Sequence, residues 1–248
     1  MEAEAENKAI ALTAIGSEKP FMAIAIRGVC DLHLVGAGAG AQCFPFFVYD
    51  EDETNRRENV TDWVLEQFRT HYKNKKIGKW DIFYYVYGLL HHAGYREKFA
   101  DNLKGELPRI PLAPDFKAFS ADGQKLAALH LDYETLEPWP LEWIEAPKVP
   151  LSYHVEKMKL SKDKSSLEIN PSLTLAGIPP QTFQYRLGNP SALEWVIDQY
   201  QVSTDKRSGI TSDPNRDDDQ EYIVRLVGQV VRVSVETVKI VDALPAFA

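Results

Sequence analysis

The sequence has few cysteines and no long apolar run. Its two cysteines, Cys30 and Cys43, lack the spacing of a zinc site and are too few for a disulfide framework. We therefore expect both to be small, buried apolar side chains without a further role. No apolar stretch approaches the roughly 20 residues that span a bilayer, and the N-terminus is acidic, unlike that of a secretory signal. These absences predict a cytoplasmic protein without membrane contact.

Positive charge is outnumbered by negative charge. The 248 residues include 28 Lys and Arg against 36 Asp and Glu, and the formal net charge of -8 disfavours binding to a polyanion such as DNA. The distribution is uneven, because residues 56–109 contain 11 Lys and Arg but only 7 Asp and Glu, a local net charge of +4 that leaves -12 for the rest. A basic stripe on an acidic protein can still contact phosphates.

Motifs for catalysis and metal binding are missing. No glycine-rich loop carries the lysine that binds ATP phosphates, and the strings at Asn170 and Asn189 lack the second proline and the aromatic residue of an adenine methyltransferase tetrapeptide. Residues 213–219 alternate oxygens as a calcium loop does, but without its glycine and glutamate. His91 and His92 are adjacent, so they diverge on a helix and favour its C-terminal dipole over a shared zinc ion. We therefore expect neither catalytic residues nor a metal site.

One glycine-rich stretch, Gly36-Ala-Gly-Ala-Gly-Ala41, fits the dinucleotide fingerprint and follows a predicted strand. That motif requires a helix immediately afterwards, whose N-terminus receives the pyrophosphate. The residues that follow are instead a β-like aromatic run containing Pro45. A flexible hairpin loop is favoured, and a dinucleotide-binding oxidoreductase is the weakest functional alternative; a strand after Gly40 would exclude it.

The first half of the chain is predicted to contain short strands and then helices. Gly and charged turns separate strand-like runs, and apolar residues at helical spacing follow. The helix that begins near Lys79 is apolar nearly all round, so we expect it to be buried. Pro108 and Pro111 predict an extended segment after it. The expected strands are 10–15, 21–26, 32–35 and 44–49, and the expected helices are 59–72 with Asn59 as its cap, 79–93, a shorter piece over 95–104, and 113–133.

The second half is predicted to contain a β-meander and C-terminal helices. Ser191 and Glu194 form a capping box at the start of one helix. The valine-rich end, residues 222–244, favours two helical pieces broken near Ser234. The expected strands are 153–160, 166–169, 173–175 and 183–187, and a long polar loop covers 203–220.

These elements predict the α+β class, with short N-terminal strands, a central helical cluster, and a β-meander followed by helices. We expect four parts. Residues 1–58 would be a β-rich segment that abuts a catalytic domain outside this chain, and 59–136 a helical subdomain. A Pro-rich connector, 137–150, would lead to an α+β subdomain over 151–248.

Several motifs occur in the order found in one family of restriction enzymes. They are Asp81-Ile-Phe-Tyr-Tyr-Val-Tyr-Gly-Leu-Leu-His-His92, Tyr95-Arg-Glu-Lys-Phe99, Leu107-Pro-Arg-Ile-Pro111, Gly177-Ile-Pro-Pro180, Ser191-Ala-Leu-Glu-Trp-Val-Ile-Asp198, Asp205-Lys-Arg-Ser-Gly-Ile210 and Ser234-Val-Glu-Thr-Val-Lys239. The chain resembles the C-terminal specificity region of type ISP restriction-modification enzymes, which join nuclease, helicase, gamma-class adenine methyltransferase and target-recognition domains in one polypeptide.

The resemblance implies a target-recognition domain that binds double-stranded DNA and directs methylation and cleavage by the methyltransferase and helicase parts of the polypeptide. S-adenosylmethionine, ATP and Mg²⁺ would belong to those domains, and no cofactor to this chain. Side chains suited to phosphates or base edges lie in polar loops and near predicted strands. The candidates for DNA contact are Arg56, Arg57, Lys73, Lys75, Lys76, Lys162, Lys164, Gln181, Gln184, Arg186, Lys206, Arg207 and Arg216.

A protein of another class would fit the acidic composition better. In this alternative the chain couples neighbouring domains without touching DNA, and aromatic side chains such as Trp139 and Trp143 dock on them. Spacing alone does not choose between the two hypotheses.

Overall fold

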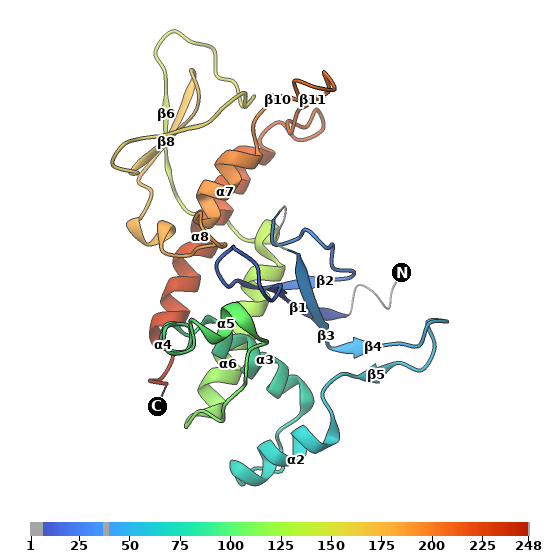
Figure 1. Ribbon diagram of the computed structural model, residues 1–248. Coiled ribbons are helices and arrows are strands. Elements are labelled where there is room, and N and C mark those ends of the chain that lie inside the picture. The colour runs from blue at the N-terminus through green and yellow to red at the C-terminus, as the bar shows by residue number, and fades with distance from the viewer. Residues whose placement is uncertain (1–6, 37–39, 248) are drawn as a thin grey trace. The chain divides into compact units, whose positions relative to one another are not determined.

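The computed structural model describes residues 7–36 and 40–247, and the chain divides into two compact units (Figure 1). Unit 1 comprises Met1–Leu131 and Lys239–Ala248, and unit 2 comprises Asp132–Val238. Strands, a helical cluster, a meander and a final helix follow one another along the chain, which confirms the α+β class. None of the helices in the described ranges combines the length and apolarity needed to cross a membrane.

Unit 1 begins with an antiparallel sheet. β1 (Lys8–Thr13) lies between β2 (Ala23–Arg27) and β3 (Ala41–Pro45), and the short strands β4 (Phe47–Val48) and β5 (Arg57–Glu58) pair separately. Ile10 and Leu12 on β1 point into the main core of the unit. The strand predicted over 32–35 is absent, because Asp31 forms a turn: its carboxylate accepts the His33 N–H and its carbonyl accepts the Leu34 N–H.

A strand, not a helix, follows the glycine-rich stretch. β3 begins at Ala41, directly after Gly40, and pairs with β1 in register Thr13↔Ala41. No helix N-terminus is therefore available to a pyrophosphate at this position, and the dinucleotide-binding hypothesis is wrong. Residues 37–39 of the stretch lie outside the described residues. Cys43 on β3 and Cys30 before it are partly exposed, which corrects the expectation of two buried side chains.

The helices of unit 1 are α2 (Asp62–His71), α3 (Lys79–His91), α4 (Ala93–Lys98), α5 (Asn102–Gly105) and α6 (Phe116–Leu131). As predicted, α3 is buried on most sides. It crosses α6 at Gly88 and Gly123, where the two backbones come into direct contact. The cap of α2 is Thr61, whose Oγ1 accepts the Val64 N–H, whereas the predicted cap Asn59 donates to the Pro45 carbonyl.

Three tyrosines hold the extended segment after α5. The hydroxyls of Tyr95, Tyr85 and Tyr72 donate to the carbonyl oxygens of three alternate residues, Arg109, Pro111 and Ala113, at 2.8, 2.6 and 2.6 Å. Alternate carbonyls of an extended chain point the same way, so one aromatic face can satisfy all three. The segment is thus stabilised without pairing in a sheet.

We expect Tyr85→Phe to lower the free energy of unfolding by about 1–3 kcal/mol. The Tyr85 hydroxyl also accepts the buried Ala113 N–H at 2.7 Å, so its removal leaves one donor and one acceptor unpaired. Chemical denaturation followed by circular dichroism measures the change. Tyr72→Phe is the comparison variant: its partly buried hydroxyl bonds one backbone group, the Ala113 carbonyl, whereas that of Tyr85 bonds two, so its loss should cost less. Equal costs for the two variants would contradict this account.

The adjacent histidines do not act as a charged pair at the end of α3. The His91 ring is buried, its Nδ1 bonds the Tyr87 carbonyl at 2.8 Å, and burial lowers its pKa well below the usual value. His92 caps α4 by accepting the Tyr95 N–H, and its Nε2 donates to the Pro245 carbonyl. Burial lowers the pKa of His92 too. The predicted dipole role is wrong, because both rings are neutral structural groups.

Unit 2 is built on a four-stranded antiparallel sheet of order β6-β9-β8-β7. The strands are β6 (Glu142–Glu145), β7 (Lys159–Leu160), β8 (Ser166–Asn170) and β9 (Leu173–Ala176), so the Pro-rich stretch 137–150 contributes an edge strand. The strand predicted over 153–160 is limited to its last two residues. No strand forms over 183–187. The 3-10 helix η2 (Pro180–Phe183) ends where that strand was predicted to begin. A second short 3-10 helix, η1 (Tyr133–Thr135), opens the unit.

The helices of unit 2 are α7 (Ala192–Gln199) and the part of α8 (Tyr222–Ala243) that precedes Lys239. The capping box of α7 is formed as predicted, with the Ser191 hydroxyl and the Glu194 carboxylate bonding each other's backbone N–H. A small hairpin, β10 (Ser203–Thr204) and β11 (Thr211–Ser212), lies in the polar loop. α8 is one continuous helix, so the predicted break near Ser234 is wrong. The buried Ser234 hydroxyl donates to the Val230 carbonyl at 2.7 Å and is satisfied within the helix.

Candidate nucleic-acid interface

The residues predicted to contact DNA fall into three surface groups. The first lies around α2 in unit 1, the second at the β7–β8 turn and η2 in unit 2, and the third in the β10–β11 hairpin and the loop after it, also in unit 2. Each group is held by its own hydrogen bonds and ion pairs. These contacts determine which side chains are available to a ligand.

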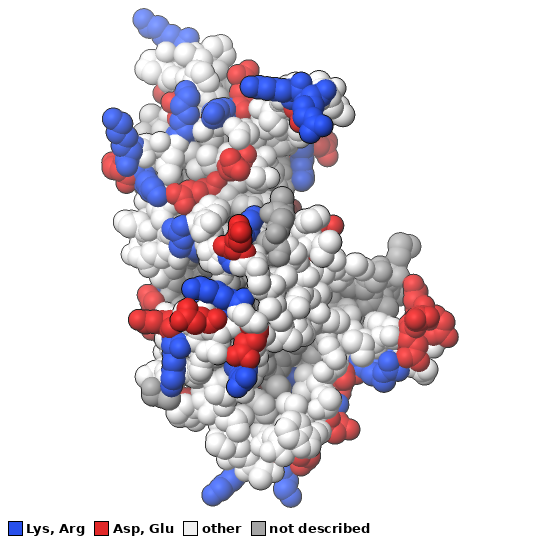
Figure 2. Space-filling model, viewed as in Figure 1, with Lys and Arg blue, Asp and Glu red and all other residues white. Residues whose placement is uncertain are grey.

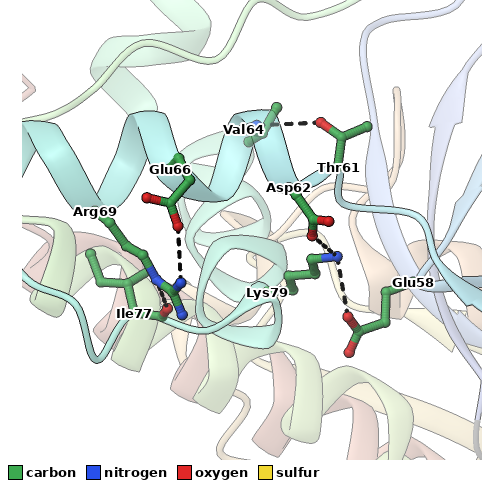
Figure 3. Close-up of polar contacts among 8 residues, drawn as sticks. All are labelled: Glu58, Thr61, Asp62, Val64, Glu66, Arg69, Ile77 and Lys79. Carbon is green, nitrogen blue, oxygen red and sulfur yellow. Dashed lines mark hydrogen bonds and ion pairs between the residues drawn. The ribbon is translucent and has the colours of Figure 1, made fainter.

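The loop between α2 and α3 presents three lysines on an ordered backbone. Asn74 organises the loop: its N–H donates to the Arg69 carbonyl, and its side-chain oxygen accepts the Lys76 N–H at 3.0 Å. Arg69 ties the far end of the loop to α2, because its Nε donates to the Ile77 carbonyl at 2.9 Å (Figure 3). The exposed lysines of the loop are Lys73, Lys75 and Lys76.

Lys79 is adjacent in sequence to this loop, but it already forms ion pairs within the protein. Its Nζ lies 2.7 Å from Asp62 and 3.3 Å from Glu58, which joins the start of α3 to the start of α2 (Figure 3). The hydrogen bond to Asp62 raises the pKa of Lys79 and lowers that of Asp62. Lys79 therefore fixes the frame that carries the loop lysines.

Arg56 and Arg57 are committed to their own hairpin. Arg57 forms an ion pair with Asp50 at 2.7 Å, and the pKa of Asp50 is lowered by hydrogen bonds from Asn55 and then Arg57. The Arg56 guanidinium lies 3.7 Å from the centroid of the Phe47 ring. They precede α2 and the loop lysines follow it, and a helix of 10 residues is about 15 Å long. The structure thus does not bring the two clusters together.

The β7–β8 turn is fixed by Asp163 and anchored by Lys164. The Asp163 carboxylate accepts bonds from Ser161 and Ser165, which lower its pKa. The Lys164 Nζ lies 2.7 Å from Glu194 on α7 and 4.8 Å from the centroid of the Phe183 ring. Together with the Ser191 bonds, this contact lowers the pKa of Glu194 to about 2. Both Lys162 and Lys164 are exposed, but Lys164 is a structural link between the turn and α7.

Gln181, Gln184 and Arg186 do not lie on a strand. Gln181 is in η2, Gln184 caps it, and Arg186 forms an isolated bridge with Ser191. All three side chains are exposed. Lys164 of the β7–β8 turn lies over the ring of Phe183, so the turn contacts this short segment.

The β10–β11 hairpin presents Lys206 and Arg207 at its tip. The Asp205 carboxylate accepts the N–H groups of Ser208 and Arg207 at 2.7 and 3.0 Å, and these bonds, the Ser208 bond first, lower its pKa. Gly209, with φ of 71°, closes the turn through its bond to the Asp205 carbonyl. In the space-filling view, Lys and Arg side chains gather at the end of this hairpin (Figure 2). Its turn is ordered and its cations are exposed.

The acidic loop after the hairpin is held by its own contacts. The Arg216 guanidinium lies 3.3 Å from the centroid of the Tyr222 ring, and Asn215 bonds the Val155 backbone through both its oxygen and its nitrogen. Asp219 pairs with Arg225. In the described ranges no three His, Cys, Asp or Glu residues are grouped as metal ligands.

Two further aromatic side chains are exposed on helices, at positions that the motifs of the sequence did not indicate. Trp63 on α2 is 71% exposed and Trp195 on α7 is 44% exposed. Trp63 lies two positions before the buried Leu65, and Trp195 immediately precedes the buried Val196. A tryptophan at a polar helix position is the signal that could have identified them.

Comparison with known proteins identifies similar sequences and structures. The family model described as the Type ISP C-terminal specificity domain matches residues 1–226. No curated protein matches the chain. Three solved structures are similar over 98% of the chain: a nuclease-deletion mutant of the Type ISP restriction-modification enzyme LlaGI in complex with a DNA substrate mimic (36% identity, TM-score 0.81), a DrdV–DNA complex (38%, 0.86), and the ATP-dependent Type ISP enzyme LlaBIII bound to DNA (31%, 0.84). The chain spans 21%, 25% and 16% of those chains, respectively.

Proposed function

Because the chain belongs to the family of Type ISP C-terminal specificity domains, we propose that it recognises a target site in double-stranded DNA on behalf of a larger restriction-modification polypeptide. The observation that carries this proposal is the likeness of nearly the whole chain to three DNA-bound enzymes, at 31–38% identity. A feature of this chain's own structure also supports the proposal: the hydrogen-bonded hairpin tip that carries Lys206 and Arg207.

We propose a DNA contact for each candidate residue according to whether its side chain is exposed and already bonded within the protein. Lysines and arginines that are exposed and uncommitted suit phosphates, and the side chains of the η2 segment suit base edges because amides and Arg form paired hydrogen bonds there. Arg56, Arg57, Lys164 and Arg216 support the surface through their own contacts. The proposed phosphate contacts are Lys73, Lys75, Lys76, Lys162, Lys206 and Arg207, and the proposed base contacts are Gln181, Gln184 and Arg186.

The chain makes up a quarter or less of the enzymes it resembles. We propose that methylation, translocation and cleavage belong to other domains of such a polypeptide, together with S-adenosylmethionine, ATP and Mg²⁺. The role of this chain is then to hold the duplex and select the site. Its acidic net charge is compatible with that role, because phosphate contact depends on local clusters of cations.

We expect this chain to bind duplex DNA with an affinity that falls as salt rises, and Lys206→Ala/Arg207→Ala to weaken binding at all sequences. Each lost phosphate contact reduces the slope of log K against log salt by about 1, so the double variant should lose about 2. Fluorescence anisotropy with a random-sequence duplex pool, from about 30 to 200 mM salt, measures both quantities.

The matched control is Lys117→Ala/Lys125→Ala, which removes the same charge from exposed positions on α6. It should leave the slope nearly unchanged. Equal losses in the two double variants would show that net charge, and not the hairpin, determines binding. Binding that does not respond to salt would contradict phosphate contact altogether.

A second candidate function is a coupling module for neighbouring domains. It is favoured by β6, an edge strand whose Trp143 and Ile144 side chains are 45% and 47% exposed. Trp139, also predicted to dock, is half-buried with Arg232 beside its ring. If the chain binds no DNA even at the lowest salt, this function is preferred.

A further inference from the structure

The β10–β11 hairpin projects from unit 2 and carries one apolar side chain. All ten residues from 203 to 212 are exposed (Figure 1). Nine of the ten are polar, charged or glycine. The tenth, Ile210, is 69% exposed. A hydrogen-bonded, projecting hairpin thus presents a single apolar side chain to a ligand.

The turn does not require the Ile210 side chain. Ile210 contributes its backbone: its carbonyl accepts the Asp205 N–H at 2.9 Å, and its N–H donates to the Ser208 Oγ at 3.3 Å. Across the strands, the hydroxyls of Thr204 and Thr211 are hydrogen-bonded at 2.9 Å. Any residue except proline offers the same backbone groups. The side chain is therefore held in place by the turn but has no part in forming it.

Two cations lie in the same turn. Asp205 and Ile210 close it, and Lys206 and Arg207 follow Asp205 directly. Lys and Arg side chains gather at this end of the hairpin (Figure 2). The Asp205 carboxylate is bound by the N–H groups of Ser208 and Arg207. A ligand that fits this surface has negative charge beside an apolar group, and duplex DNA has this combination, because its phosphates flank the apolar faces of stacked bases.

Given the proposed function, on which this step rests, we propose that Ile210 is an apolar wedge. It enters between two neighbouring base pairs of the duplex, while Lys206 and Arg207 bind the phosphates beside that step. Apolar side chains such as Ile, Leu and Phe unstack base steps in this way in proteins that bend DNA. Pyrimidine–purine steps unstack most readily. Ile210 would therefore contribute to site selection without a hydrogen bond to a base edge.

Ile210→Ala in the full chain tests the wedge. We expect it to bind the random-sequence duplex pool about fivefold more weakly than the parent, because the burial of three side-chain carbons between bases is only partly offset by the cost of unstacking. The slope of log K against log salt should not change, since no phosphate contact is lost. Ile210→Leu keeps an apolar side chain of similar size and should bind within about twofold of the parent.

The matched control is Ile15→Ala, which shortens an isoleucine that is 46% exposed in the turn after β1 of unit 1. It should bind the duplex pool as the parent does. Thermal unfolding followed by circular dichroism should give the same melting temperature for the parent, Ile210→Ala and Ile15→Ala, because both side chains are exposed. A difference in binding then reports on the DNA contact.

A duplex with a one-nucleotide gap separates insertion from contact at the DNA surface. The stack is already broken at the gap, so a wedge enters there without the cost of unstacking. We expect the parent to prefer the gapped duplex over the intact duplex of the same sequence by about tenfold. Ile210→Ala should lose most of that preference. Lys206→Ala/Arg207→Ala should bind both duplexes more weakly but keep the preference.

The outcomes distinguish the wedge from the proposed function. If the parent binds duplex with the expected salt dependence, but Ile210→Ala has the same affinity and the same preference for the gap, the wedge is wrong and the proposed function stands. A preference for the gap that survives in Ile210→Ala would also overturn the wedge, because the flexibility of the DNA would then explain it. No salt-dependent binding by the parent would overturn both.

Discussion

Gly123→Ala should destabilise unit 1 by about 3 kcal/mol or more, which is exceptional for the addition of one methyl group. A Cβ at this position would lie 1.8 Å from the Tyr84 carbonyl oxygen and 2.8 Å from the Gly88 nitrogen, both backbone atoms of α3. Backbone cannot rotate away as the end of a flexible side chain can. The helices α3 and α6 would have to separate, and the core between them would open.

Thermal and urea unfolding, followed by circular dichroism, measure the loss. Gly105→Ala is the matched control, because that glycine ends α5 with a negative φ and nothing lies within 4 Å of the position that the added methyl group would take. This control should stay within about 0.5 kcal/mol of the parent. Gly88→Ala, whose Cβ would meet the Phe119 carbonyl oxygen at 2.5 Å, should also be strongly destabilised. A mild effect at Gly123 would mean that the two helices are not in backbone contact.

The sequence predicted that α3 is buried, but not what surrounds it. Periodicity reports which faces of a helix are apolar, and α3 is apolar nearly all round. It does not report that Gly88 faces Gly123, because that pairing joins residues 35 positions apart. The extended segment at 107–113 was predicted from its prolines, whereas the three tyrosines that bind its carbonyls could be identified only in three dimensions.

The same limit applies to the candidate interface. Sequence identifies cations, but it does not show which are already paired. Arg57 pairs with Asp50 and Lys164 with Glu194, and Arg216 covers Tyr222. The hairpin that carries Lys206 was predicted only as a polar loop, since two strands of two residues each leave almost no pattern. The break predicted at Ser234 failed for a related reason, because a buried hydroxyl can be satisfied within its own helix.

Acid should destabilise unit 1 through its buried histidines before most carboxylates are protonated. The Tyr87 hydroxyl accepts the Ala25 N–H and is hydrogen-bonded to the His130 Nδ1 at 2.6 Å, and the His130 ring is buried in the core. Burial, and then the nearby Arg96 charge, lower its pKa to about 3, and they lower the pKa of His91 well below its usual value. The unfolded chain binds a proton at each ring near pH 6.5, whereas the folded protein does not.

The contribution of each ring is complete above about pH 6.5 and is lost as the pH falls below it, at about 1.4 kcal/mol per pH unit and ring; for His130 the loss continues toward pH 3. Urea unfolding at several pH values between 8 and 4 measures the slope. His130→Gln keeps an acceptor for Tyr87 but does not titrate, so its free energy of unfolding should fall less steeply with pH, by the equivalent of one proton. His154→Gln is the control for the loss of an imidazole, because His154 is exposed on unit 2. If the wild type and His130→Gln have the same slope, His130 is not buried in its neutral form, and the network through Tyr87 does not set the acid stability of this unit.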